Sequence, residues 1–166
     1  MKNFLLILFL LPIMPAYAQE TPDENLAILA PFIGTWKAEV GEDTHDVSNY
    51  AWILGGKAMR IMHSINGGDY GGEALLHWNS GKQAITFHYV TTASFYTEGT
   101  ITPTETGFDA HETVYGNMGG ITETLSGYAM KDGEIHVWSQ FLKDGEWTEK
   151  SRVTYVNAPG AQVKFR

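Results

Sequence analysis

The sequence predicts an all-β protein, an antiparallel up-and-down β-barrel of about ten strands preceded by a short helix. From Thr35 onward the 166-residue chain is rich in Thr, Tyr, Val, Ile, Phe and Trp, the residue types that favour strands. Turn dipeptides interrupt this pattern about every ten residues, which is typical of consecutive β-hairpins. These dipeptides are Gly55-Gly56, Gly67-Gly68, Ser80-Gly81, Gly119-Gly120, Asp132-Gly133 and Asp144-Gly145.

An antiparallel meander of this length would expose two unpaired edge strands unless it closed on itself. Closure into a barrel is therefore the architecture we expect. A two-sheet sandwich is the alternative, although no long crossing connection of the Greek-key kind separates the strand patterns. No linker or low-complexity tract divides the chain, so we expect one domain over residues 19–166.

Residues 1–18 have the features of a secretory signal peptide. Lys2 is followed by the apolar run from Phe4 to Leu11 and then by the small-residue cleavage pattern Ala16-Tyr17-Ala18. The alternative is a membrane anchor, but the run is too short for a bilayer of ~30 Å and is interrupted by prolines. We therefore expect a periplasmic or secreted protein that starts at Gln19 and has no membrane partner after cleavage.

The composition excludes several classes of function. The chain has no cysteine, which removes disulfides, thiolate zinc sites and cysteine nucleophiles. Its formal net charge is −8 and its basic residues are scattered, so we expect no nucleic-acid partner. The histidines lack the spacing of a metal site, and no phosphate loop, dinucleotide fingerprint or nucleophile elbow occurs. We therefore expect no metal and no cofactor, and we assign no catalytic residue or oligomeric state.

The first expected element is a short helix over residues 21–29, capped by Thr21 or Asp23. The segment Pro31-Phe32-Ile33-Gly34-Thr35-Trp36 then opens the first strand, and its tryptophan is large enough to plug one end of a barrel. The strands are expected at residues 35–41, 45–54, 57–65, 70–78, 83–91, 95–102, 107–115, 121–131, 134–143 and 146–156.

Hairpin geometry predicts which side chains face the interior, because a two-residue loop fixes the residues that stand opposite each other. Around Gly55-Gly56 this rule places three pairs on the face that should lie inside: Trp52 with Met59, Tyr50 with Ile61, and Ser48 with His63. Aromatic walls with a few polar tips suit a small amphipathic ligand. The predicted ligand-binding residues are Tyr50, Trp52, Met59, Ile61 and His63, and core packing is the alternative for each of them.

The same rule applied around Ser80-Gly81 gives an apolar face, on which Leu76 is expected opposite Ile85. On the other face it places Glu73 opposite His88, an acid and an imidazole within reach of each other. An ordinary surface contact is the alternative interpretation of this pair. The last three strands have two faces of mixed polarity, so which of them lines the interior stays open.

The short helix, the Gly34-Thr35-Trp36 start and the final strand Ser151-Arg152-Val153-Thr154-Tyr155 resemble the calycin barrels, the lipocalin-like group. Within that group, Trp52-Ile53-Leu54-Gly55-Gly56-Lys57 and Leu76-His77-Trp78-Asn79 are similar to the bacterial DUF1579-type proteins of unknown function. The resemblance implies carriage or sensing of a small hydrophobic molecule, without shared catalytic residues. It also implies that Arg152 stacks on Trp36 and closes the base of the barrel. The nitrobindin-like haem barrels begin similarly, but their iron-binding histidine lies close to the C-terminus, whereas the last histidine here is His136.

Two functions are compatible with these features. The first is an exported barrel that binds a small hydrophobic or amphipathic molecule, as a carrier or sensor. The alternative is an enzyme, a cyclase, isomerase or hydrolase, that acts on an apolar substrate in the barrel through one acid-base residue. The candidates for that residue are Glu73, His63, His77, His88 and His136.

Overall fold

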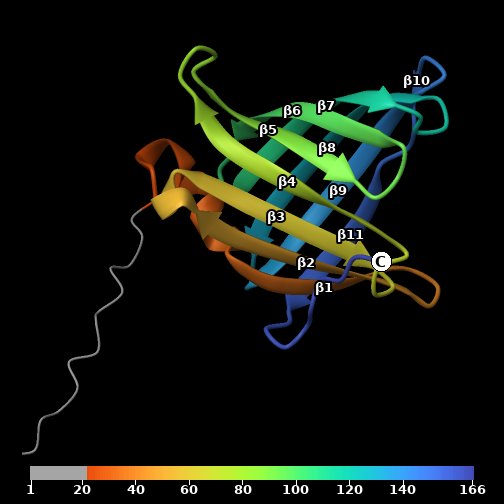
Figure 1. The fold of residues 1–166 in the computed structure, drawn as a ribbon, viewed down its shortest axis with the longest axis horizontal. Coiled ribbons are helices and arrows are strands. Elements are labelled where there is room, and N and C mark those ends of the chain that lie inside the picture. The colour runs from red at the N-terminus through yellow and green to blue at the C-terminus, as the bar shows by residue number, and fades with distance from the viewer. Residues whose placement is uncertain (1–21) are drawn as a thin grey trace, which may run out of the picture.

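The computed structural model describes residues 22–166, which form a closed ten-stranded antiparallel barrel with a short helix at one end (Figure 1). The predicted all-β, up-and-down architecture is confirmed. The predicted signal peptide and Thr21 lie outside the described residues. The elements are η1 (Glu24–Phe32), β1 (Gly34–Gly41), β2 (Thr44–Ile53), η2 (Leu54–Gly56), β3 (Ala58–Ile65), β4 (Tyr70–Asn79), β5 (Ala84–Thr91), β6 (Phe95–Pro103), β7 (Gly107–Gly116), β8 (Ile121–Lys131), β9 (Glu134–Lys143), β10 (Glu146–Trp147) and β11 (Ser151–Asn157).

The barrel closes through β11, which lies between β9 and β1. From β1 to β9 each strand pairs with the next one in the chain, so the first and last long strands complete the ring. Residues 146–156, which we expected to form one strand, form β10 and β11 with a break between them, and both pair with β9. This continuous ring excludes the two-sheet sandwich and leaves no long strand edge unpaired among the described residues.

The register of the β2–β3 hairpin is the one predicted from its glycine turn. Trp52 stands opposite Met59, and Ser48 stands opposite His63. The turn needs glycine, because Gly55 and Gly56 have φ angles of 66° and 79°. The inner face of this hairpin was therefore readable from the sequence.

The register of the β4–β5 hairpin differs from the predicted one by two residues. Leu76 stands opposite Phe87, and Glu73 stands opposite Val90. The cause is the turn, which uses residues 80–83, with Gln83 in the left-handed conformation at φ 51°, instead of a two-residue loop. A shift of two residues keeps each side chain on its face, so the apolar face is as expected, but the Glu73 pairing with His88 is wrong.

Helix η1 closes one end of the barrel, at the orange end of the ribbon in Figure 1. The side chain of Asp23 caps it, as predicted for one of the two candidates. Trp36 is 4% exposed, and its indole Nε1 donates a 2.8 Å hydrogen bond to the carbonyl of Phe32. The helix fills this end with three fully buried side chains, Leu26, Leu29 and Phe32.

The expected stacking of Arg152 on Trp36 is wrong. Trp36 is buried inside the barrel, whereas Arg152 is exposed and stands opposite Trp138 in β9. The residue opposite Trp36 is Asn157, five residues beyond Arg152, which is roughly 16 Å along a strand. The cation that does lie over an indole is Lys150, whose Nζ is 3.6 Å from the ring centroid of Trp138.

The chain after β11 returns along the outside of the barrel toward the end opposite η1. The backbone amide of Lys164 donates a 3.0 Å hydrogen bond to the hydroxyl of Ser64 in β3, and Arg166 pairs with Asp69 at 2.7 Å. Ser64 is consequently 1% exposed. Within residues 22–166, no helix has both the length and the apolar character that crossing a membrane would require.

Candidate functional site

The barrel contains a cavity of about 230 Å³ between the side chains of its inner face. Side chains from most of the strands line it, so the cavity exists only in the closed barrel. Its apolar wall consists of Ile61, Leu76, Phe87, Ile101, Phe108 and Val137.

The polarity of the cavity changes along the barrel axis. On β3 the apolar Ile61 lies nearer η1 and His63 lies farther from it, and both line the cavity. On β7, Ala110 and Glu112 follow the same order. The half of the cavity next to η1 is therefore apolar, and the opposite half holds the groups that can form hydrogen bonds.

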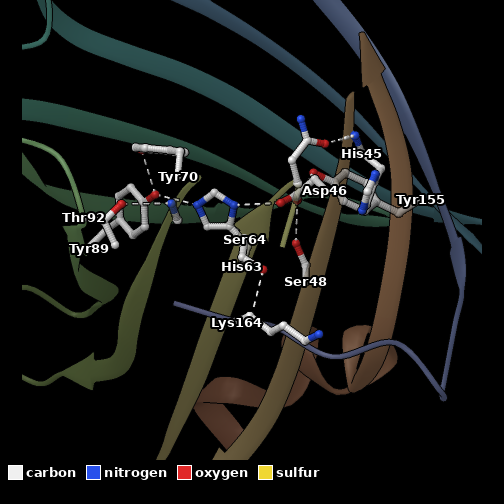
Figure 2. Close-up of polar contacts among 12 residues, drawn as sticks. His45, Asp46, Ser48, His63, Ser64, Tyr70, Tyr89, Thr92, Tyr155 and Lys164 are labelled. Atoms are coloured by element: carbon white, nitrogen blue, oxygen red, sulfur yellow. Dashed lines mark hydrogen bonds and ion pairs between the residues drawn. The ribbon is translucent and has the colours of Figure 1, made fainter. Parts of the chain in front are cut away.

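Asp46 is the centre of the polar half. It is 3% exposed and accepts hydrogen bonds from the hydroxyls of Ser48 at 2.9 Å and Tyr155 at 2.8 Å (Figure 2). Its other oxygen lies 2.9 Å from Nδ1 of His63. Because an ionised carboxylate only accepts hydrogen bonds, all three partners direct a proton toward Asp46. Strands β2, β3 and β11 are thus joined through one buried side chain.

The network continues from His63 to two tyrosines. Nε2 of His63 lies 2.6 Å from the hydroxyl of Tyr89, which lies 3.0 Å from the hydroxyl of Tyr70 (Figure 2). With Nδ1–H directed at Asp46, a neutral imidazole accepts at Nε2, so Tyr89 donates to it. Burial raises the pKa of Tyr70 and the pKa of Tyr89, which keeps both phenols protonated at neutral pH.

A close backbone approach positions Tyr89. A Cβ atom at Gly72 would overlap the Tyr89 ring, so only glycine at this position of β4 lets the ring lie against the neighbouring strand. The ring is consequently held with its hydroxyl next to His63.

Glu112 forms a second polar group, on β7 and therefore far around the ring of strands from β3. The hydroxyl of Thr97 donates a 2.5 Å hydrogen bond to Oε2 of Glu112. Burial raises the pKa of the Glu112 carboxyl. On β8 the buried hydroxyls of Thr124 and Ser126 have no partner of hydrogen-bond geometry within residues 22–166.

Three of the five predicted ligand-binding residues, Tyr50, Ile61 and His63, line the cavity. Met59 is fully buried in the core, and Trp52 packs against that core without lining the cavity. All five lie on the predicted face of the β2–β3 hairpin. Their contact with a ligand stays a prediction.

The other acid-base candidates lie on the outside of the barrel. Glu73, His77 and His88 are exposed, and 43% of the His136 side chain is exposed. His63 differs, because it lines the cavity with 22% of its side chain exposed. The described part of the chain holds no group of three or more His, Asp or Glu side chains arranged for a metal ion.

Sequence reasoning missed Asp46, Tyr89, Glu112 and Tyr155 as lining residues. For Asp46 a signal existed, because it lies two residues before Ser48 on the pleat already assigned to the inside. For Tyr155 no such signal existed, because the break between β10 and β11 hides its pleat.

The antiparallel ring, with its helix at one end and its cavity inside, is consistent with a calycin or lipocalin-like fold. No protein-family model matches the chain, and the search of curated proteins finds no match.

Proposed function

We propose that this protein is an exported carrier or sensor that binds a small hydrophobic or amphipathic molecule inside its barrel. The observation that supports this most is the cavity of about 230 Å³, with an apolar wall toward η1 and hydrogen-bonding groups in the other half. Protein interiors are normally close-packed, so a cavity of this size needs a reason. Known ligand pockets have volumes of about 300–1,000 Å³, and this cavity is smaller. Its ligand is therefore restricted to a small molecule.

The polar network supports the same proposal. Burying Asp46 is costly unless its partners are held in place, and an apolar core would be as stable or more stable. A buried network that reaches from Asp46 through His63 to Tyr89 and also lines a cavity is better suited to orienting a ligand than to stabilising the fold.

Native mass spectrometry of gently purified protein, with binding of the neutral dye prodan, tests this function. The variant Ala110→Phe fills the cavity from β7, and the matched variant Thr113→Phe places the same ring on the exposed side of that strand. We expect a bound mass or dye fluorescence in the wild type and in Thr113→Phe, and neither in a folded Ala110→Phe. Equal dye binding by the two variants would contradict a site in the cavity.

The compartment and the narrower family are part of the proposal. The signal-peptide pattern of residues 1–18 supports export to the periplasm or the medium. The similarity to DUF1579-type proteins is supported by Trp52-Ile53-Leu54-Gly55-Gly56-Lys57, which forms the end of β2 and the η2 turn beside the closed end. Export is tested by the N-terminal sequence of the protein recovered outside the cytoplasm, which should begin at Gln19.

Asp46 and His63 also favour the second candidate function, an enzyme acting on a small apolar substrate. His63 has a carboxylate on Nδ1 and lines a cavity that holds a second carboxyl, Glu112. A base and a carboxyl whose pKa is raised by burial, on different walls, could move a proton between two carbons of an unsaturated ketone. Conversion of cyclohex-3-enone to its conjugated isomer, followed by ultraviolet absorbance, tests this. Activity that is unchanged in His63→Gln would exclude this role.

A further inference from the structure

The charge of the cavity indicates what its ligand carries. Two of the lining residues, Asp46 and Glu112, are acidic, and none is a lysine or an arginine. We infer, on the basis of the proposed binding function, that the ligand is a small organic amine whose ammonium group lies in the polar half of the cavity, within reach of Glu112. Its apolar part would then lie against the wall nearer η1.

The direction of the hydrogen bonds points to a ligand that donates. The hydroxyls of Ser48 and Tyr155 donate their protons to Asp46, and Tyr89 donates to His63 when the imidazole is neutral with its proton on Nδ1. What these oxygens still offer to the cavity is their lone pairs, which accept hydrogen bonds. An ammonium group has three donors and no acceptor, so it matches this surface, whereas a carboxylate ligand would meet no lysine or arginine.

Glu112 has the environment of a carboxylate that lacks a counter-ion. Glu112 is half-buried, and this burial raises its pKa, since the charged form is disfavoured there. An ammonium beside it would restore the charged form and replace lost hydration. Opposite Glu112 on β8 stands Thr124, which is 6% exposed, and its neighbour on that inner face, Ser126, is 5% exposed. Both hydroxyls lack a partner of hydrogen-bond geometry in the described chain, and neither residue lines the cavity itself.

Aromatic side chains complete the match to a cation. The rings of Phe87, Tyr89 and Tyr128 line the same cavity as Glu112. Aromatic rings attract ammonium groups, and this attraction is stronger where water is excluded. An acidic group with aromatic neighbours and no lysine or arginine beside it therefore favours an amine over an alcohol or an acid of equal shape.

Three probes with the same phenyl body test the inference: 2-phenylethylamine, 2-phenylethanol and phenylacetate. Each is titrated calorimetrically into the wild type at neutral pH. We expect the amine to bind about tenfold or more tightly than the alcohol, and phenylacetate to show no binding. In Glu112→Gln the amine should bind only as well as the alcohol, while the affinity for the alcohol is retained. The matched variant Glu73→Gln, on the exposed face of β4, should keep the preference of the wild type for the amine.

The outcomes separate this inference from the proposed function. If the alcohol binds but the amine is not preferred, or if Glu112→Gln leaves the preference intact, the inference is wrong and the binding function stands. If phenylacetate binds as tightly as the amine, the inference is likewise wrong. If none of the three probes binds and prodan does not bind either, both the inference and the proposed function are overturned.

Discussion

Asp46 joins the last strand of the barrel to the second and third, so its removal should weaken the closure itself. The Tyr155 hydroxyl reaches Asp46 from β11 across 109 positions of the chain. A hydrogen bond to a charged group contributes about 1.5–3 kcal/mol, and Tyr155→Phe removes one such bond. Asp46→Asn keeps the shape but turns one acceptor into a donor that faces other donors, and we expect it to cost about 3–5 kcal/mol. That is a large share of a total stability of about 5–15 kcal/mol.

Urea unfolding followed by tryptophan fluorescence measures the loss of stability in Tyr155→Phe and in Asp46→Asn, if the dependence of the unfolding free energy on urea concentration is the same as in the wild type. Because the two side chains share one hydrogen bond, their double variant should be destabilised by less than the sum, with a coupling of about 0.5–3 kcal/mol. Tyr96→Phe, on an exposed tyrosine of β6, is the control and should stay within about 0.5 kcal/mol of the wild type. Additive losses, or a Tyr155→Phe variant as stable as this control, would refute the role assigned to Asp46.

Further predictions concern other side chains. Burial raises the pKa of Glu112, so the folded protein loses stability as pH rises through that pKa. Glu112→Gln should therefore raise the free energy of unfolding of the ligand-free protein at neutral pH, measured in urea. A lower free energy of unfolding would contradict this prediction. Burial raises the pKa of Tyr128 to about 12. Its contribution to stability is therefore complete below pH ~10 and is lost as pH rises to about 12. Unfolding measured at stepped alkaline pH should show this loss for the wild type and a smaller loss for Tyr128→Phe. Trp36→Phe should cost at least ~1 kcal/mol for the lost bond to the Phe32 carbonyl. Arg152→Lys should change the melting temperature little, since the Arg152 side chain is exposed. A marked drop in melting temperature would contradict this exposed position.

The strands could be predicted because local patterns determine them. Turn residues recur at hairpin spacing, and between them the side chains favour strands, so each strand up to β9 lies within a few residues of its expected position. The β2–β3 register followed from Gly55-Gly56, whose positive φ angles favour a tight turn. Around Ser80-Gly81 the same reasoning gave the wrong register, because the chain uses a four-residue turn that ends at Gln83.

The candidate site could be predicted only where one hairpin forms it. Tyr50, Ile61 and His63 share the β2–β3 hairpin, so register alone placed them together. Glu112 and Tyr155 reach the cavity only through the closure of the whole ring, which depends on contacts between distant strands. Local periodicity carries no information about such contacts.

The resemblance to calycins predicted the fold but misplaced a contact. It implied that Arg152 would meet Trp36, yet the register of β11 against β1 puts the two residues at different heights and on different faces. The Trp36 indole is satisfied locally, by the carbonyl of Phe32 four residues earlier. A short motif shared with a group of barrels therefore did not specify which residues of the motif contact each other.

We propose that a small molecule binds inside the barrel and not on its outer surface. Methyl-resolved NMR during titration with 2-phenylethylamine tests it most directly, because neighbouring residues of one strand point to opposite sides. We predict that the methyl signals of Leu76 and Val137, which line the cavity, shift with saturation, while those of Leu75 and Val90, which are exposed outside, stay in place. Saturable shifts confined to Leu75 and Val90, with Leu76 and Val137 unmoved, would place the binding site on the outer surface instead.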